Sequence, residues 1–514
     1  MNENKSQKGE DKETIGEPTD ISRDGNGRDN AEGDNNGEDG APATSDTTGD
    51  TPREKRGHPF LIIALAVAIL FIASFMPWSK WTGGKISDFN LLSDVFPMLS
   101  TEDDTTETVN PATALDPELE KLAQETQAQA FDTITEDTTV RIVVAEMPPR
   151  RDDGQLVIED YTPDGSGLSH LKAALAKRTE RPVRIGVTGD SYIEGDIFTQ
   201  DVRSMLQQQY GGRGVGYVPA HSETAGFRRS VGHRSSGWTE HDIRKPGNHK
   251  FTLSGQHFSG SAGSTFTFTA SARTPETAGW SVSKVLLTSS RGGRVTLSNE
   301  HTAQTFDIAA APDSVQCLTL PGETGKFTLT SSVPDIVVLG AWLEDADGVV
   351  LDNMSLRGDS GMTHRRVSKD RTAQMRRYVD YDLIVLEYGI NALSEKQKDY
   401  TSYRKVMTQV ARHLKECYPN ADIVIMGIGD RGVKKNGQVI SIPTAEAMVS
   451  AQRNAARDAG VLFWDTREAM GGEGAIINWR AEKLVNGDYI HLNAQGGKRL
   501  AEEFVQSLEA KLSE

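Results

Sequence analysis

Three short, uninterrupted apolar runs in the C-terminal third of the chain constrain its fold more than any other feature. They read DLIVLEY, DIVIMG and VLFWD, at residues 382–388, 422–427 and 461–465. Stretches with helical apolar spacing separate and follow them, at residues 402–417, 444–459 and 493–512. Strands without polar alternation are buried on both faces. The pattern therefore predicts an α/β domain with a parallel sheet covered by helices on each side.

An earlier stretch adds a strand and a candidate nucleophile. Residues 183–196 read VRIGVTGDSYIEGD, a β-branched run that turns at a glycine and leads towards a helix. A strand–turn–helix of this kind lifts a serine, here Ser191, out of the sheet and beside the free N–H groups of the helix N-terminus. We expect residues 184–188 to form the first strand of the sheet. Glu194 and Asp196 are expected at a solvent-facing helix start.

The hydrophobic pattern of the sequence changes between these two regions. Residues 232–352 contain short runs in which polar and apolar residues alternate, at 264–270, 283–288, 294–297, 326–330 and 336–339. Clusters of Gly, Pro, Ser and Asp separate the runs. Period-two alternation with regular turn signals predicts an antiparallel β-sandwich. We therefore predict one α/β domain in two parts, residues 136–231 and 353–514, with the sandwich of residues 232–352 inserted between them.

The N-terminal part of the chain is predicted to be a tail, an anchor and a stalk. Residues 1–57 are acidic and poor in large apolar side chains, with 14 acidic and five basic residues in the first 50. Such a segment cannot offset its chain entropy, so we expect it to be disordered. Residues 79–135 are polar and are predicted to be a stalk. The net charge of −17 argues against a nucleic-acid partner.

The segment between tail and stalk has the character of a membrane span. Residues 59–76 form an uncharged apolar run that would be about 27 Å long as a helix, close to the thickness of a bilayer core. Basic residues precede the run and tryptophans follow it. This arrangement predicts a single transmembrane helix over residues 58–78, with the N-terminus in the cytoplasm. Residues 79–514 are then expected outside the cytoplasmic membrane.

Four polar residues are expected to meet at one edge of the predicted sheet. Ser191 follows the first strand, Asn391 follows residues 382–388, and Asp488 and His491 precede the last helix. Side chains beyond the carboxyl ends of parallel strands gather there. The Asp488-x-x-His491 spacing suits a base and its orienter, since His491 can take the Ser191 proton while Asp488 holds the other ring nitrogen. The Asn391 amide can stabilise an oxyanion, together with the N–H groups of Ser191 and of a glycine.

Other reactive side chains are given structural interpretations. Cys317 and Cys417 fall in different predicted domains, so they are expected to be unpaired, buried thiols. No Cys or His cluster has metal-ligand spacing, so neither a metal nor a cofactor is expected. Glu387, at the end of a predicted strand, either lines the pocket, packs in the interior or pairs with an arginine. The three tryptophans of the insert are expected in its core rather than stacked on sugar rings.

The polar motifs resemble those of a known superfamily. GDS at Gly189–Ser191, GIN at Gly389–Asn391 and DYIH at Asp488–His491 are similar to blocks I, III and V of the SGNH/GDSL hydrolases. The similarity covers about residues 180–230 and 353–512. It implies a flavodoxin-like three-layer fold and a catalytic set of Ser191, Gly358, Asn391, Asp488 and His491. Gly361 is the alternative to Gly358 as the block II glycine.

A narrower resemblance is to exported peptidoglycan O-acetylesterases. It rests on residues 189–219, on the inserted β domain, and on WDTREAMGG at residues 464–472. In those enzymes the insert resembles a carbohydrate-binding jelly roll. Tyr192 departs from the pattern, because other residues often follow the serine. The resemblance implies a serine esterase at a bacterial inner membrane, with a periplasmic catalytic domain that acts on an O-acetylated glycan. An O-acetyltransferase and a non-catalytic glycan-binding protein remain alternatives.

Overall fold

The computed structural model describes residues 154–247 and 249–514, which all belong to one compact unit, Glu107–Glu514. The predicted tail, transmembrane helix and stalk (residues 1–135) lie outside the described residues. So do residues 136–153 of the predicted α/β domain. Within the described part of the chain, no helix has the length and apolar character needed to cross a membrane.

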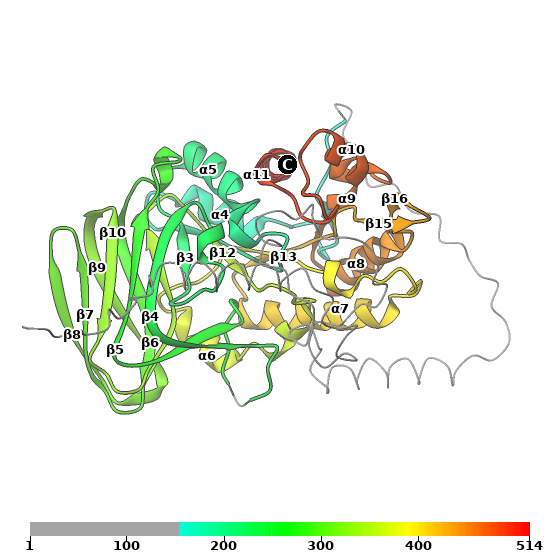
Figure 1. The fold of residues 1–514 in the computed structure, drawn as a ribbon. Helices are drawn as coiled ribbons and strands as arrows, with labels where there is room; N and C mark the ends of the chain where they lie inside the picture. Colours follow the sequence, from blue (N-terminus) through cyan, green and yellow to red (C-terminus); the bar gives the residue numbers. More distant parts are fainter. Residues whose placement is uncertain (1–153, 248) are drawn as a thin grey trace, which may run out of the picture. The chain divides into compact units, whose positions relative to one another are not determined.

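A six-stranded sheet forms the centre of the α/β domain within the described residues (Figure 1). Its spatial order is β1 (Glu159–Asp160), β17 (Leu462–Trp464), β14 (Asp422–Met426), β13 (Leu383–Glu387), β2 (Val183–Gly189) and β12 (Val349–Ser355). All neighbouring pairs are parallel except β1 and β17. Counted along the chain, the five parallel strands have the order 2-1-3-4-5, which is the flavodoxin-like order. The predicted parallel α/β sheet is confirmed.

Helices cover both faces of this sheet. Successive strand residues point to opposite sides, so each strand contributes side chains to the core on both faces. In β13, Leu383 and Val385 join one buried cluster, and Ile384 and Leu386 join the other. The first cluster contains side chains of α4 (Ser169–Ala176), α5 (Thr199–Tyr210), α9 (Thr466–Met470), α10 (Ala475–Ala481) and α11 (Ala494–Leu512). The second contains side chains of α6 (Lys369–Met375), α7 (Thr401–Cys417) and α8 (Ala445–Ala459). The three predicted helices correspond to α7, α8 and α11.

Strand β12 was not anticipated in this sheet. It pairs with β2 in parallel from Val349 to Ser355, so the α/β sheet resumes inside the range assigned to the insert. The apolar run of β12 is interrupted by Asp352 and Asn353, both buried. The Asp352 carboxylate accepts hydrogen bonds from Tyr217 N, Trp342 Nε1 and Tyr381 Oη, each at 2.8 Å. These partners satisfy a polar side chain whose burial would otherwise be unfavourable.

The insert is an antiparallel sheet that folds around its own core (Figure 1, green and lime). Within the described residues its strands are β3 (Gly216–Val218), β4 (Val231–Asp242), β5 (Gln256–Ala270), β6 (Trp280–Ser289), β7 (Gly293–Asn299), β8 (Ala303–Ile308), β9 (Ala311–Thr324), β10 (Lys326–Ser331) and β11 (Ile336–Glu344). All five predicted runs fall within strands of this sheet. Trp280 and Trp342 are buried, as expected, whereas Trp238 is only half-buried and packs against the outside of the core. Cys317 and Cys417 are unpaired, also as expected.

A buried ion pair joins the two sheets. The Arg184 guanidinium on β2 donates to both carboxylate oxygens of Glu344 on β11, with Nη1 to Oε2 at 2.6 Å. Lys284 on β6 also reaches Glu344, at 2.6 Å. The side chains of Arg184 and Glu344 are 5% and 0% exposed, so water cannot replace either partner. The insert is therefore fixed against the first strand of the catalytic sheet.

Candidate active site

The turn after β2 lifts Ser191 away from the sheet. Gly189 ends the strand, and a Cβ there would lie 2.8 Å from both the backbone oxygen and Oε2 of Glu387. Only glycine allows this close approach. Asp190 then turns inward and is fully buried, and its carboxylate accepts from Tyr192 N at 2.9 Å. Ser191 is left half-buried at the carboxyl edge of the sheet.

Ser191, His491 and Asp488 form a continuous hydrogen-bonded chain. The Ser191 Oγ lies 3.0 Å from His491 Nε2, and His491 Nδ1 lies 2.7 Å from Asp488 Oδ2. The other Asp488 oxygen accepts from the backbone of Ile490 and of His491, at 3.0 and 3.1 Å. Partial burial opposes ionisation of Asp488, but these hydrogen bonds outweigh it and lower its pKa. An ionised Asp488 holds His491 with Nε2 directed at the serine, the arrangement that nucleophilic catalysis requires.

The expected oxyanion donors lie beside this chain, and one of them is engaged. Asn391, in the short helix η7 (Ile390–Ala392), donates its Nδ2 hydrogens to Asp190 Oδ2 at 2.8 Å and to the Asp359 backbone oxygen at 3.1 Å. An oxyanion would have to replace one of these acceptors. The Gly361 N–H is donated to Asp359 Oδ1 at 3.1 Å. Gly358 has a φ of 79°, and its N–H has no acceptor in the described part of the chain.

Two carboxyl groups are buried together beneath Ser191. Asp190 and Glu387 are 0% and 1% exposed, and Glu387 Oε2 has no hydrogen-bond partner. Burial raises the pKa of Asp190 to about 7, and hydrogen bonds from Tyr192 and Asn391 oppose this only in part. Burial and the neighbouring Asp190 raise the pKa of Glu387 well above its usual range. Glu387 therefore neither pairs with an arginine nor lines an open pocket. It shares a low-dielectric site with Asp190, where two negative charges would repel.

The Glu387→Gln variant is expected to gain stability relative to the wild type as the pH rises. A raised native pKa means that folding retains a proton that the unfolded chain loses above its ordinary pKa of 4.5. The stability from protonated Glu387 is fully present below that pH and is lost as the pH rises through the native pKa. Glutamine cannot ionise, so the urea midpoint of the variant should move upward relative to that of the wild type as the pH rises above about 5. If the difference in urea midpoint between the variant and the wild type did not change with pH, Glu387 would titrate normally.

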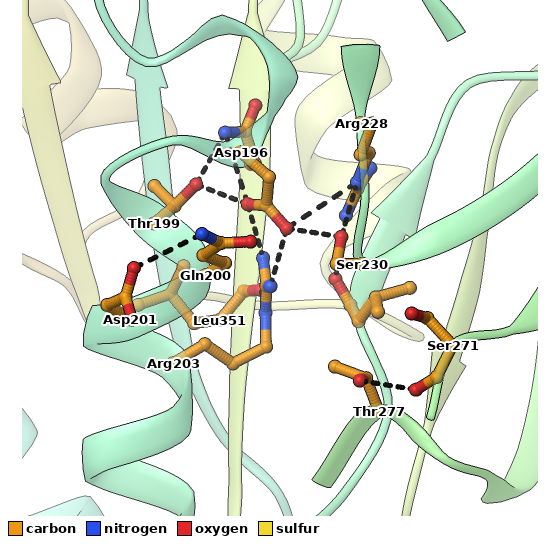
Figure 2. A network of polar contacts seen from close by, with 12 residues as sticks. Asp196, Thr199, Gln200, Asp201, Arg203, Arg228, Ser230, Ser271, Thr277 and Leu351 are labelled. Atoms are coloured by element: carbon orange, nitrogen blue, oxygen red, sulfur yellow. Dashed lines mark hydrogen bonds and ion pairs between the residues drawn. The ribbon is translucent and has the colours of Figure 1, made fainter. Parts of the chain in front are cut away.

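A buried network holds the segment that follows Ser191 (Figure 2). Asp196, in the short helix η3 (Glu194–Asp196), has a φ of 67° and a side chain that is 0% exposed. Arg203 on α5 donates to both of its oxygens, at 2.7 and 3.0 Å. Ser230 donates to the same carboxylate, and Arg228 lies 3.6 Å away. The expectation of a solvent-facing Asp196 was wrong, because the chain turns back against β12 before α5 begins.

The charge state of Asp196 follows from this network. Burial opposes its ionisation, but the guanidinium groups of Arg203 and Arg228 outweigh it and lower its pKa. Asn353 on β12 donates to the Ile193 backbone oxygen at 2.9 Å and to Thr199 Oγ1 at 2.6 Å. The segment after Ser191 is thereby attached to both the sheet and α5. Such supporting contacts fix the position of a nucleophile.

A polar cleft of about 270 Å³ opens next to Gly358. Glu194, Arg357 and Gly358 line it from the α/β domain, and Glu240 and Gln256 line it from the insert. Its lining does not include Ser191, Asn391, Asp488 or His491. Glu194, three residues after Ser191, pairs with Arg357 at its margin, and its side chain is only 10% exposed, so the expectation that it faces solvent was wrong. The cleft is therefore a candidate binding surface beside the catalytic chain.

Tyr192, the departure from the resemblance, has a packing role. Its side chain is 3% exposed, and its hydroxyl donates to Met470 Sδ on α9 at 3.4 Å. It points into the core cluster that also contains α5 and α11. Tyr192 therefore does not alter the surface that a substrate would meet.

Comparison with known sequences identifies the C-terminal part of the chain. Residues 333–499 match the GDSL-like Lipase/Acylhydrolase family. The matched region contains Asn391, Asp488 and His491 but not Ser191, because the insert displaces the nucleophile far upstream. No curated protein matches the chain.

The first of three similar solved structures supports the same fold. The structure titled "Peptidoglycan O-acetylesterase in action, 5 min" aligns with a TM-score of 0.57 at 23% identity, covering 69% of this chain and 99% of its own. A family two carbohydrate esterase from Cellvibrio japonicus aligns at 0.25 and 12% identity, covering 55% and 99%. A carbohydrate acetylesterase from Sinorhizobium meliloti aligns at 0.24 and 12%, covering 32% and 79%. Residues 333–499 are therefore similar to GDSL-type acylhydrolases, and the described part of the chain shares its fold with the structure titled as a peptidoglycan O-acetylesterase.

Proposed function

From the GDSL-type hydrolase domain as premise, we propose that this chain is a membrane-anchored serine esterase that removes O-acetyl groups from a cell-wall glycan, with peptidoglycan as the substrate. The observation that carries the proposal is the hydrogen-bonded chain from Ser191 through His491 to Asp488, with links of 3.0 and 2.7 Å. The predicted helix over residues 58–78 would hold the domain at the outer face of the cytoplasmic membrane.

The first half of the reaction forms an acyl-enzyme. Ser191 Oγ attacks the acetyl carbonyl carbon while His491 Nε2 takes its proton. Asp488, which is held ionised, stabilises the resulting imidazolium. The N–H groups of Ser191 and Gly358 and the amide of Asn391 hold the oxyanion, once the oxyanion replaces one acceptor of Asn391. His491 then gives its proton to the departing sugar oxygen.

The second half returns the enzyme and releases acetate. Water attacks the acetyl-serine ester, with His491 again as base. The side chains of His491 and Asp488 are 30% and 44% exposed, so solvent reaches the acyl-enzyme directly. This openness favours hydrolysis over transfer to another sugar, since transfer requires that water be excluded.

The polar cleft supports a glycan as the substrate. Its lining combines amide, carboxylate and guanidinium groups, which can exchange hydrogen bonds with sugar hydroxyls. The structure titled as a peptidoglycan O-acetylesterase shares this fold over 69% of the chain. Together these features favour an acetylated cell-wall polymer over a lipid ester.

Gln256→Ala is expected to lower kcat/KM for O-acetylated peptidoglycan about tenfold, the effect of losing one or two hydrogen bonds to the polymer. The rate with a small acetyl ester should stay unchanged, because Gln256 lies on the insert and away from Ser191. Gln209→Ala, on an exposed residue outside the cleft, is the matched control. If Gln256→Ala lowered kcat/KM equally for both substrates, or did not lower it for the polymer, the glycan would bind outside this cleft. Assays with an added sugar acceptor would detect transfer of the acetyl group.

A further inference from the structure

Three histidines of the insert come together at one end of the β4–β5 hairpin. His241 lies near the end of β4, His257 near the start of β5, and His249 in the loop between them. His241 and His257 are directly opposite each other in the antiparallel register. The ring centroids are 4.7 to 5.0 Å apart for all three pairs. One ring nitrogen from each residue lies within 4.8 Å of the other two.

We propose that His241, His249 and His257 bind one divalent transition-metal ion of the zinc class. Imidazole nitrogen is a preferred ligand of Zn²⁺, and three such ligands with one open position form a common type of zinc site. Zn–N bonds of about 2.0–2.1 Å would bring the nitrogens to about 3.4 Å from one another. His249 is exposed and lies in a loop, so it can move by the ångström or so that closure requires.

The surroundings hold two of the three rings in fixed orientations. His257 is 6% exposed, and its ring stacks on Phe251 with 5.1 Å between the ring centroids. His241 Nε2 lies 2.9 Å from Ser259 Oγ, which orients the ring and leaves Nδ1 free, as outer-shell partners of metal ligands do. The rings of His249 and His257 have no hydrogen-bond partner among the described residues.

The site is connected to the segment that carries the candidate oxyanion glycine. Backbone carbonyls of the β4–β5 loop form hydrogen bonds with side chains of residues 357–367. Leu253 O lies 3.1 Å from His364 Nε2, and Ile243 O accepts from Arg366 Nη1 at 2.7 Å. Phe251 forms a β-bridge with Val367. A metal that joins both ends of the loop to its middle would restrict these contacts to one arrangement. Metal binding should therefore stabilise the junction between the insert and the α/β domain.

The spacing of the ligands explains why a metal site could not be expected from the sequence. Seven residues separate His241 from His249, and seven separate His249 from His257. Neither interval is a familiar ligand spacing, and proximity arises only from the register of the hairpin.

The test is a Zn²⁺ titration of the metal-free, full-length protein, with calorimetry and thermal unfolding as the two readouts. We expect one saturable site, a rise in Tm with Zn²⁺, and affinity lowered at least about tenfold by His249→Ala or His241→Gln. His301→Ala, on another exposed histidine of the insert, is the control and should bind as the wild type does. Co²⁺ at the same site should give the visible absorption of a four- or five-coordinate ion. The proposal is overturned if the wild type shows no saturable site, or if His249→Ala binds Zn²⁺ as tightly as His301→Ala.

Discussion

Replacing Ser191 with alanine is expected to lower kcat/KM for a small acetyl ester by a factor of roughly 10⁴ to 10⁶. The Ser191 Oγ is the proposed nucleophile at the end of the hydrogen-bonded chain, 3.0 Å from His491 Nε2. Alanine removes the attacking atom but preserves the turn, because the contacts of Asp190 and Tyr192 that hold the turn do not use the serine hydroxyl. The loss should therefore appear in kcat without loss of stability.

The same experiment can distinguish a triad from independent contributions. His491→Ala should reduce activity to a similar level, and the Ser191→Ala, His491→Ala double variant should be no worse than either one. Ser314→Ala is the matched control, since Ser314 is exposed and does not line the cleft. Additive losses, or full activity in Ser191→Ala, would show that another group carries out the attack.

Arg203→Met is expected to destabilise the folded protein by about 3–5 kcal/mol, the usual cost of leaving one partner of a buried ion pair unmatched. Asp196 would keep its neutral donors on Thr199, Ser230 and Asn353, but the nearest remaining cation would be Arg228, at 3.6 Å, while its carboxylate stays 0% exposed. The shift is measured as a fall in the urea midpoint of the full-length protein. Asp196→Asn combined with Arg203→Met should recover part of the loss, because it also removes the buried charge.

A bidentate pair on the surface is the control for this effect. Arg404 on α7 donates to both oxygens of Asp458, at 2.6 and 2.8 Å, but the two side chains are 39% and 35% exposed. Arg404→Met should cost no more than about 1 kcal/mol. Equal effects of Arg203→Met and Arg404→Met would mean that burial adds nothing to the pair in Figure 2.

The parts of the fold that the sequence predicted are those with a simple hydrophobic pattern. Strands β13, β14 and β17 fall in continuous apolar runs, β2 is a β-branched run, and the strands of the insert alternate. Strand β12 was missed because Asp352 and Asn353 interrupt its apolar run. Their burial depends on hydrogen bonds to residues far away in the sequence, such as Trp342 and Thr199, and no local pattern contains these partners.

The candidate site was predicted to a similar extent and for a similar reason. Strand ends determine which side chains gather at the edge of a parallel sheet, so Ser191, Asp488 and His491 could be associated from strand order alone. The engagement of Asn391 with Asp190, and the burial of Glu387 against the same carboxyl, depend on side-chain directions that strand order does not specify. These contacts determine the electrostatics beneath the nucleophile.

The most direct test of the proposed function is acetate release from O-acetylated peptidoglycan by the full-length protein, compared with its Ser191→Ala variant. We expect the wild type to release acetate until the ester is consumed and the variant to release none above the uncatalysed rate. Release of acetate by both proteins, or by neither while the wild type still hydrolyses a small acetyl ester, would contradict a peptidoglycan esterase that acts through Ser191.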